Sequence, residues 1–373
     1  MSVPLDRLYN FLQDICNQDI LIYRFLPHGS RKIDDCKPLK LCTDQYIKMF
    51  CHDQETLNYK DYDLLTAKFT NSPELLCSIF EIATRRYVGT STKFYNQSLM
   101  LHSEMNSQDV AWFEQHYSVG VYWWSHAVIA RDWFRYAEID PVFANPKSIQ
   151  KTFLIYNRAW SGLREYRIKF TELVLTQNLQ DHCQLTFNPE DSGQHWLQHK
   201  FANPAFEPTR TDLDQYFPPA NFDSVASADY TSLDYNQTLI EVVLETVFDD
   251  TKWHLTEKTL RPIACGQPFV LVSTPGSLEY LKRYGFRTFG DYFDESYDRI
   301  QDPVQRLEAV VDLMKSLSEL STEQQQKLHH QLKDICKFNK DRFFSKEFFN
   351  QVVDEFKINV DCGFSKIKQS VLA

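Results

Sequence analysis

Glycine is scarce in this chain, and its scarcity excludes two common ways of binding nucleotides. Ten of the 373 residues are glycine, where average usage of ~7% would give roughly 26. The sequence contains neither G-x-G-x-x-G nor G-x-x-x-x-G-K-[ST], so the glycine-rich loops of dinucleotide-binding folds and of P-loop proteins are both missing. We therefore expect any phosphate to be bound by side chains or by a helix N-terminus.

Further absences narrow the class of protein. The nine cysteines include no C-x-x-C pair, which argues against a secreted disulfide framework and a zinc ribbon. No apolar run approaches the ~18 residues of a membrane-spanning helix, and the N-terminal segment does not resemble a signal peptide. The net charge of −10 argues against a surface that is basic throughout, although a local basic cleft stays compatible with it. We expect a cytoplasmic protein with no membrane partner.

Apolar segments followed by polar ones predict an α/β protein with a parallel sheet in each half of the chain. Strands that alternate with helices are typical of such sheets. The predicted strands are 20–26, 46–50, 98–101 and 119–124 in the first half, and 151–157, 238–246 and 267–273 in the second. The predicted helices are 1–15, 163–179, 256–265, 277–285 and 302–320, and the remaining chain is also expected to be helical.

A break near 141–150 separates the two halves. Pro141, Asn145 and Pro146 interrupt the pattern of strands and helices there, as expected of a linker. We therefore predict α/β domains over 1–148 and 149–320, with a C-terminal helical tail over 321–373. A cleft between two such domains is a natural place for a ligand.

Polar clusters follow three strands of the first half. CHDQE (51–55), HSE (102–104) and SHAVIARDWFRYAE (125–138) come after the strands at 46–50, 98–101 and 119–124. Ligands of open parallel sheets bind beyond the carboxyl ends of the strands, so these clusters stand where a site is expected.

A basic segment opens the helix at 163–179. Residues 151–170 hold five basic side chains and one acid. Arg158, Arg164 and Arg167 are the arginines among them, and guanidinium groups near a helix N-terminus suit a diphosphate. The alternative is an ordinary solvated helix face.

The segment HLTEK (254–258) stands at the start of another helix. Glu257 there can accept both hydroxyls of a ribose, and Lys258 can neutralise a phosphate. The alternative is a capping arrangement, in which Thr256 is the N-cap and the glutamate lies in the first turn.

The order of these elements resembles the nucleotide-sugar half of GT-B glycosyltransferases, and is closest to the α-1,3-fucosyltransferase and exostosin-like families. HLTEK matches the Thr-Glu-Lys motif of the fucosyltransferases. Glu245 stands where their Glu-Asn-Ser strand begins, but Thr246 and Val247 replace the Asn-Ser. The resemblance implies that Glu257 binds the ribose, that Lys258 binds the diphosphate, and that Arg164 or Arg167 also contacts the diphosphate.

A closer similarity, which runs through most of the chain, relates it to phage-encoded glycosyltransferase-like proteins. It includes CHDQE, HSE, WWSHAVIARDWFRYAE, HLTEKTLRPIACGQPF and GFRTFGDYFDESYD. The resemblance implies a GT-B-like fold, in which two Rossmann-like domains face a cleft. The N-terminal domain would bind the acceptor and the C-terminal domain a nucleotide-sugar co-substrate, with no cofactor and no required metal.

Glycosyl transfer to a hydroxyl needs a base when configuration inverts, and it needs positively charged groups beside the departing diphosphate. The candidate groups for the chemical step and for acceptor binding all lie in the first half. For each the alternative is structural: an ion pair, a satisfied hydrogen bond, or a place in the core. The candidate acids are Asp53, Glu55, Glu104 and Asp132, and the other groups are His102, His126, Arg131 and Trp124.

The acceptor class stays open at this point. The segment CKFNKDRFFSKEFF (336–349) mixes basic residues with phenylalanines, which suits nucleic acid, but an amphipathic helix packed on a domain gives the same pattern. A hydroxymethylated base in phage DNA and a saccharide are both candidate acceptors, and a binding protein without turnover is the third hypothesis. FDESYD (293–298) is expected to cap a helix rather than to hold a cation.

Overall fold

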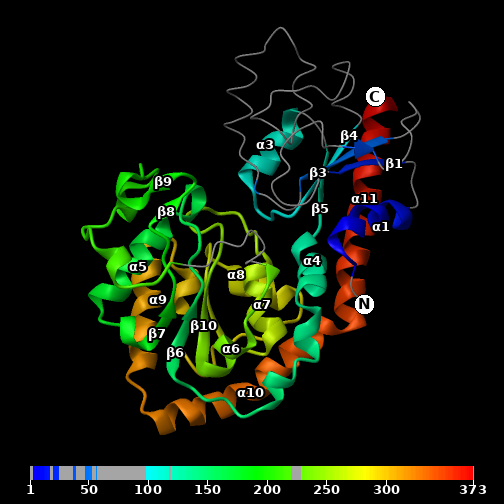
Figure 1. Cartoon of the computed structure of the whole chain (residues 1–373). Coiled ribbons are helices and arrows are strands. Elements are labelled where there is room, and N and C mark those ends of the chain that lie inside the picture. The colour runs from blue at the N-terminus through cyan, green and yellow to red at the C-terminus, as the bar shows by residue number, and fades with distance from the viewer. Residues whose placement is uncertain are drawn as a thin grey trace. The chain divides into compact units, whose positions relative to one another are not determined.

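The computed structural model describes residues 3–16, 20–24, 37–38, 47–52, 56, 98–116, 119–219 and 228–372 (Figure 1). It has two compact units, each with its own sheet. Unit 1 comprises Met1–Asp132 and Phe349–Ala373, and unit 2 comprises Trp133–Phe348. The division thus falls before the predicted boundary at 148, and the C-terminal segment returns to the N-terminal unit.

Unit 1 contains a five-stranded sheet in the order β2-β1-β3-β4-β5. Four of its strands run parallel, and the edge strand β2 is antiparallel to β1. The strands are β1 (Ile20–Arg24), β2 (Lys37–Pro38), β3 (Ile47–His52), β4 (Ser98–His102) and β5 (Val119–Tyr122). The helices are α1 (Leu5–Ile15), α3 (Gln108–His116), α4 (Ser125–Trp133) and most of α11 (Lys346–Leu372).

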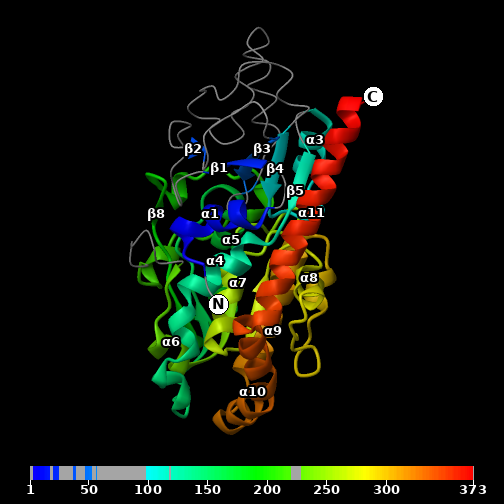
Figure 2. The ribbon, with the colours of Figure 1, turned by 90° about the vertical axis from the view of Figure 1, so that its right-hand side faces the viewer.

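The C-terminal helix α11 packs on the sheet of unit 1 (Figure 2). A Cβ atom added at Gly363 would lie 3.0 Å from a Leu99 methyl and 3.1 Å from a Val121 methyl, so the helix approaches β4 and β5 closely. Asn359 also donates a 2.7 Å hydrogen bond to the Tyr122 carbonyl. The predicted tail is therefore helical, as expected, but its second helix belongs to unit 1.

Unit 2 contains a four-stranded, fully parallel sheet in the order β11-β10-β6-β7. All seven residues of β10 are buried, as expected of a central strand covered on both faces. The strands are β6 (Lys151–Ile155), β7 (Cys183–Leu185), β10 (Thr238–Leu244) and β11 (Phe269–Val272), and β8 (Glu190–Asp191) and β9 (Gln194–His195) form a separate antiparallel pair. The helices are α5 (Tyr166–Thr176), α6 (Ser232–Gln237), α7 (Glu257–Cys265), α8 (Ser277–Arg283), α9 (Pro303–Ser318) and α10 (Thr322–Phe344).

The helix ends of unit 2 follow from local sequence. Thr256 caps α7, and its side chain accepts a hydrogen bond from the Lys258 amide, as predicted. Asp302 caps α9 in the same way, immediately before a proline. Gly285 lies just beyond α8 with a φ of +79°, a left-handed conformation that favours glycine at a helix end.

The stretch predicted as loops, 187–235, is held on α5 by two buried glutamates. Glu165 accepts hydrogen bonds from the amides of Ala202 and Asn203, at 2.8 and 2.7 Å. Glu172 accepts from the Thr209 hydroxyl at 2.7 Å and the Arg210 amide at 2.9 Å. The segment is therefore ordered over 187–219 without much regular secondary structure. Across the described residues, no helix has the length and apolar character needed to cross a membrane.

Candidate functional site

The carboxyl edge of the unit 2 sheet gathers most of the predicted donor residues. The strands are parallel, so the segments that follow them lie at one edge. The segment after β6 carries Arg158, and the segment after β10 begins with Glu245 and leads to the first turn of α7. The turn Ser273–Gly276 follows β11 at the same edge.

Glu245 joins the end of β10 to the start of α7. Its side chain is completely buried. One carboxylate oxygen accepts from the amide of Thr256 at 2.9 Å and from the hydroxyl of Thr259 at 2.5 Å, and the other accepts from the Thr256 hydroxyl at 2.7 Å. The amides of Thr246 and Thr259 add longer bonds, at 3.1 and 3.3 Å. Glu245 therefore positions the start of α7.

The Thr-Glu-Lys turn is fixed at the N-terminus of α7 as a result. The Lys258 ammonium donates to Glu257 at 2.8 Å and to the Thr256 hydroxyl at 3.2 Å. The Lys258 side chain keeps 21% of its surface exposed, while that of Glu257 keeps 6%. A partly exposed ammonium at the positive end of a helix dipole is a favourable place for an anion.

Arg167 makes structural contacts at this edge. Its buried guanidinium donates to the carbonyls of Ala159 and Leu244, both at 2.6 Å, and to that of Glu245 at 3.1 Å. The Tyr166 hydroxyl donates to the same Glu245 carbonyl at 2.6 Å. These bonds pin the start of α5 to the end of β10, and sequence spacing could not separate this role from that of a ligand.

Arg158 and Arg164 are half-buried on the segment between β6 and α5. Asp191 holds this segment by accepting from the amides of Trp160 and Ser161, at 2.9 and 2.7 Å. Burial raises the pKa of the Asp191 carboxyl, but these hydrogen bonds and the charge of Arg164 outweigh it and hold the pKa below its usual value. Both arginines thus stand on a fixed segment at the donor edge.

Three buried polar atoms at this edge make no hydrogen bond within the described part of the chain. They are Asn157 Oδ1 after β6, Thr186 Oγ1 after β7 and Arg167 Nε. An unsatisfied buried polar atom costs about 1–3 kcal/mol, so such atoms favour water or a polar ligand nearby. Sequence reasoning missed Asn157 and Thr186, because an Asn or Thr after a strand carries no distinctive motif.

The long connection from β10 to α7 is anchored on the turn after β11. The Trp253 indole donates to the Pro275 carbonyl at 2.8 Å, and the Thr274 hydroxyl donates to the Lys252 carbonyl at 3.0 Å. Gly276 has a φ of +81°, and a Cβ there would lie 3.0 Å from the Trp253 ring. Glycine is required at this contact, which keeps the donor edge rigid.

Unit 1 places His102 and Glu104 together at the end of β4. Both are buried, the Glu104 amide donates to His102 Nδ1 at 3.4 Å, and the Glu104 carboxylate accepts from the Ser107 hydroxyl at 2.5 Å. Asp53 and Glu55, the two candidate acids of the 51–55 cluster, lie outside the described residues. Glu104 is thus the candidate base with a defined environment at the end of a strand.

Helix α4 carries the other unit 1 candidates. His126 and Arg131 are buried, Asp132 is half-buried, and the Arg131 guanidinium lies 5.6 Å from the Phe349 ring centre. Trp124 has no exposed surface at all, so its ring belongs to the core and its prediction as an acceptor-stacking residue is wrong. Burial of a large aromatic ring stabilises the core, and a fully buried ring has no face free to stack on a sugar.

The basic residues of the C-terminal segment 336–349 mostly make contacts within the protein. Lys340 donates to the Ala137 carbonyl at 2.6 Å, Arg342 donates to the Tyr284 carbonyl, and Lys337 pairs with Asp341. Phe343 and Phe348 are fully buried. The segment is therefore a pair of amphipathic helix ends packed on the protein, and it offers little support for binding to nucleic acid.

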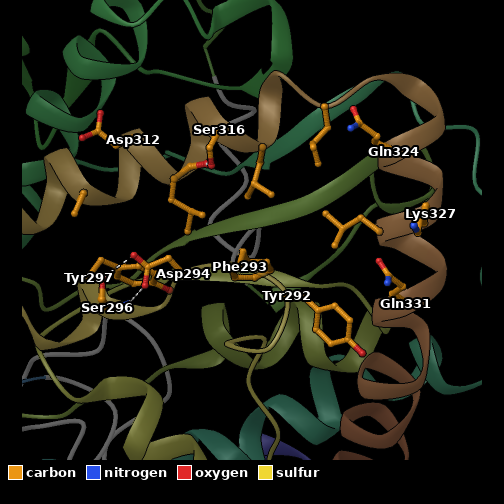
Figure 3. Close-up of a pocket in the computed structure, with 15 residues that line it drawn as sticks. Tyr292, Phe293, Asp294, Ser296, Tyr297, Asp312, Ser316, Gln324, Lys327 and Gln331 are labelled. Carbon is orange, nitrogen blue, oxygen red and sulfur yellow. Dashed lines mark hydrogen bonds between the residues drawn. The ribbon is translucent and has the colours of Figure 1, made fainter.

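A separate pocket of about 720 Å³ lies between α9, α10 and the segment Tyr292–Tyr297 (Figure 3). None of the predicted donor or catalytic residues lines it.

In FDESYD, Asp294 accepts from the amide and hydroxyl of Ser296, and Asp298 accepts from the Leu278 amide at the start of α8. The capping role expected of this segment is thus confirmed. Among the described residues, no group of three His, Cys, Asp or Glu side chains could hold a metal ion.

Comparison with known proteins adds no assignment. No protein-family model matches the chain, and no curated protein matches it significantly. The carboxyl edge of unit 2 is therefore the strongest guide to function.

Proposed function

We propose that this protein is a nucleotide-sugar-dependent glycosyltransferase of GT-B-like architecture, in which unit 2 binds the donor. One observation carries the proposal. Glu245 is buried at the carboxyl end of a parallel strand, and its hydrogen bonds fix Thr256 and, through it, the partly exposed side chain of Lys258 at the N-terminus of α7. This arrangement binds a diphosphate without a glycine-rich loop.

Donor binding would exchange the partners of Lys258. Its ammonium now bonds the Glu257 carboxylate at 2.8 Å, and a diphosphate oxygen would replace that carboxylate. Glu257 would then accept the two ribose hydroxyls, as the resemblance to fucosyltransferases implies. Arg158 and Arg164 supply further positive charge as the diphosphate leaves, which is where charge develops in the transition state.

Unit 1 would supply the acceptor groups and the base. Glu104 is the preferred base among the described residues, with Asp132 as the second candidate and Asp53 as a third outside them. In an inverting transfer the carboxylate takes the proton of the acceptor hydroxyl, the acceptor oxygen forms a bond to the anomeric carbon, and the bond to the diphosphate breaks. His102, His126 and Arg131 would orient the acceptor or the base.

Two acceptor classes are compatible with this chemistry. A hydroxymethylated base in phage DNA would require the enzyme, in the host cytoplasm, to flip the base from the duplex. A saccharide would require no such step, and the packed basic residues of 336–349 remove one argument for DNA. A nucleotide-sugar-binding protein without turnover is the remaining alternative.

Product analysis tests the proposed activity. The wild-type protein and Lys258→Ala are incubated with a panel of nucleotide sugars, with hydroxymethylated and unmodified duplex DNA, and with soluble glycans, and the products are read by mass spectrometry. We expect a mass increase of one sugar on one acceptor with the wild type and its loss with Lys258→Ala. Nucleotide binding without any glycosylated product would favour the non-catalytic alternative. An electrophoretic shift at low salt would favour DNA over a saccharide as the acceptor class, and no shift with either duplex would argue against DNA.

A further inference from the structure

The pocket on unit 2 is a groove between two helices, here called the α9–α10 groove (Figure 3). Helix α9, helix α10 and the segment Tyr292–Tyr297 line it, and Figure 3 shows that segment running along the groove from Tyr297 to Tyr292. Its volume of about 720 Å³ falls in the range of pockets that bind small molecules, roughly 300–1,000 Å³. Its lining residues differ from those of the donor edge, so the groove is separate from that edge.

The floor of the groove is apolar. Leu313 and Leu317 of α9 and Leu328 of α10 contribute to it, with 8%, 5% and 8% of their surfaces exposed. Phe293 adds an aromatic ring that is 7% exposed. The floor thus offers an apolar surface that is partly open to a ligand.

The rim is polar, and four of its side chains are not used by the fold. Tyr292, Asp312, Lys327 and Gln331 come from three different elements, and their side chains form no hydrogen bond or ion pair within the described residues. Lys327 and Gln331 are four residues apart, so they share one face of α10. Tyr292 is 39% exposed, and Figure 3 shows it beside the end of the groove nearest Gln331.

Other rim groups are already satisfied within the protein. Asp294 accepts two hydrogen bonds from Ser296, and Gln324 completes the capping box at the start of α10. The contrast matters, because polar groups left unpaired around an apolar floor are those that can hydrogen-bond a ligand.

The charge of the free rim groups identifies the class of ligand. Two carboxylates, Asp294 and Asp312, face one ammonium, Lys327, so the groove does not favour a phosphate-rich ligand, which needs several cations. Carboxylate, amide, phenol and ammonium groups together both donate and accept hydrogen bonds. A neutral molecule with many hydroxyls on one side and an apolar face on the other matches both rim and floor.

We propose that the α9–α10 groove binds a saccharide. A sugar ring places its C–H face on the leucine floor and the Tyr292 ring, and its hydroxyls bond Asp312, Lys327 and Gln331. The proposal does not depend on the transferase activity.

Isothermal titration and saturation-transfer NMR with maltotetraose, cellotetraose and chitotetraose test this site. We expect the wild type to bind at least one of them, and Tyr292→Ala and Gln331→Ala each to weaken that binding about tenfold, which is 1.4 kcal/mol. Tyr216→Ala is the matched control, because Tyr216 is 49% exposed on unit 2 and does not line the groove. All these residues are exposed, so the variants should keep the wild-type melting temperature, which is measured in parallel.

Two results would overturn the saccharide site. One is that folded wild-type protein binds none of the three tetrasaccharides. The other is that Tyr292→Ala and Gln331→Ala bind as tightly as Tyr216→Ala. If the wild-type protein binds a tetrasaccharide but no nucleotide, the proposed transferase function is rejected while the groove assignment holds. The failure of one proposal can therefore be told from the failure of the other.

Discussion

Glu245 is the residue on which the geometry of the donor edge most depends. Its carboxylate accepts five hydrogen bonds from three threonines. Glu245→Gln replaces an acceptor oxygen by an NH₂ group that faces donors, so we expect a loss of about 2–3 kcal/mol in the free energy of unfolding. Urea unfolding measures it. Glu308→Gln, on an exposed turn of α9, is the control and should change stability by less than about 0.5 kcal/mol; equal effects would contradict the role given to Glu245.

Asp298 makes stability depend on pH. Burial raises the pKa of its carboxyl from 3.8 to about 7. Between these values the folded protein keeps a proton that the unfolded chain has lost, so the contribution of this group to stability falls as the pH rises from about 4 to 7. Asp298→Asn should therefore flatten the profile of melting temperature against pH in this window. An unchanged slope between pH 4 and 7 in the variant would contradict the shift.

The residue scale also shows how far sequence reasoning reaches. The Thr256 cap and the Lys258 position follow from neighbouring residues, so the motif predicts them. The role of Glu245 depends on Thr256 and Thr259, which lie 11 and 14 residues further along the chain, and spacing alone does not bring them together. Burial decides against Trp124 as a stacking residue, and burial is a property of the whole fold.

At the scale of elements, the close contact of α8 with α10 depends on Gly285. A Cβ there would lie 2.6 Å from the Arg342 guanidinium, which donates to the Tyr284 carbonyl. We expect Gly285→Ala to destabilise the protein by more than the ~1–2 kcal/mol cost of a positive φ. Gly193→Ala isolates that cost, because Gly193 has a φ of +76° and nothing within 4 Å of the added Cβ. Denaturant unfolding of both variants gives the difference, and equal losses would show that Arg342 moves aside freely.

Regular elements were the most predictable part of the fold. Strands such as β10, with an unbroken apolar pattern, and helices such as α9, with an Asp-Pro start, are present where the sequence predicts them. The order of 187–219 was not predictable. It depends on Glu165 and Glu172 accepting amides more than thirty residues away in the chain, and composition alone indicates only a loop.

At the scale of the molecule, the chain leaves unit 1 at Asp132 and returns to it at Phe349. Unit 2 is thus one continuous segment, Trp133–Phe348, with its own sheet and helices. We expect this fragment to fold alone and to show a cooperative thermal transition by circular dichroism. The fragment 1–132 should not, because it lacks the α11 residues that cover β4 and β5. A cooperative transition in 1–132, or none in 133–348, would contradict the division.

The path of the C-terminal segment could not be predicted from sequence. Both α10 and α11 carry apolar stripes. Such a stripe indicates that one face of the helix packs against the protein, but it does not identify the element that packs there. The pairing of α11 with unit 1 depends on shape, as in the close approach at Gly363.

Nucleotide binding at the N-terminus of α7 is the central claim, and a thermal-shift panel tests it most directly. Wild type, Lys258→Ala and Lys282→Ala, an exposed lysine of α8, are heated with nucleoside diphosphates and nucleotide sugars. A ligand at 100 times its Kd adds about 2.7 kcal/mol to the folded state. We predict that at least one nucleotide raises the melting temperature of the wild type and of Lys282→Ala, and has little effect on Lys258→Ala. No response to any nucleotide, or an equal response in Lys258→Ala, would contradict the claim.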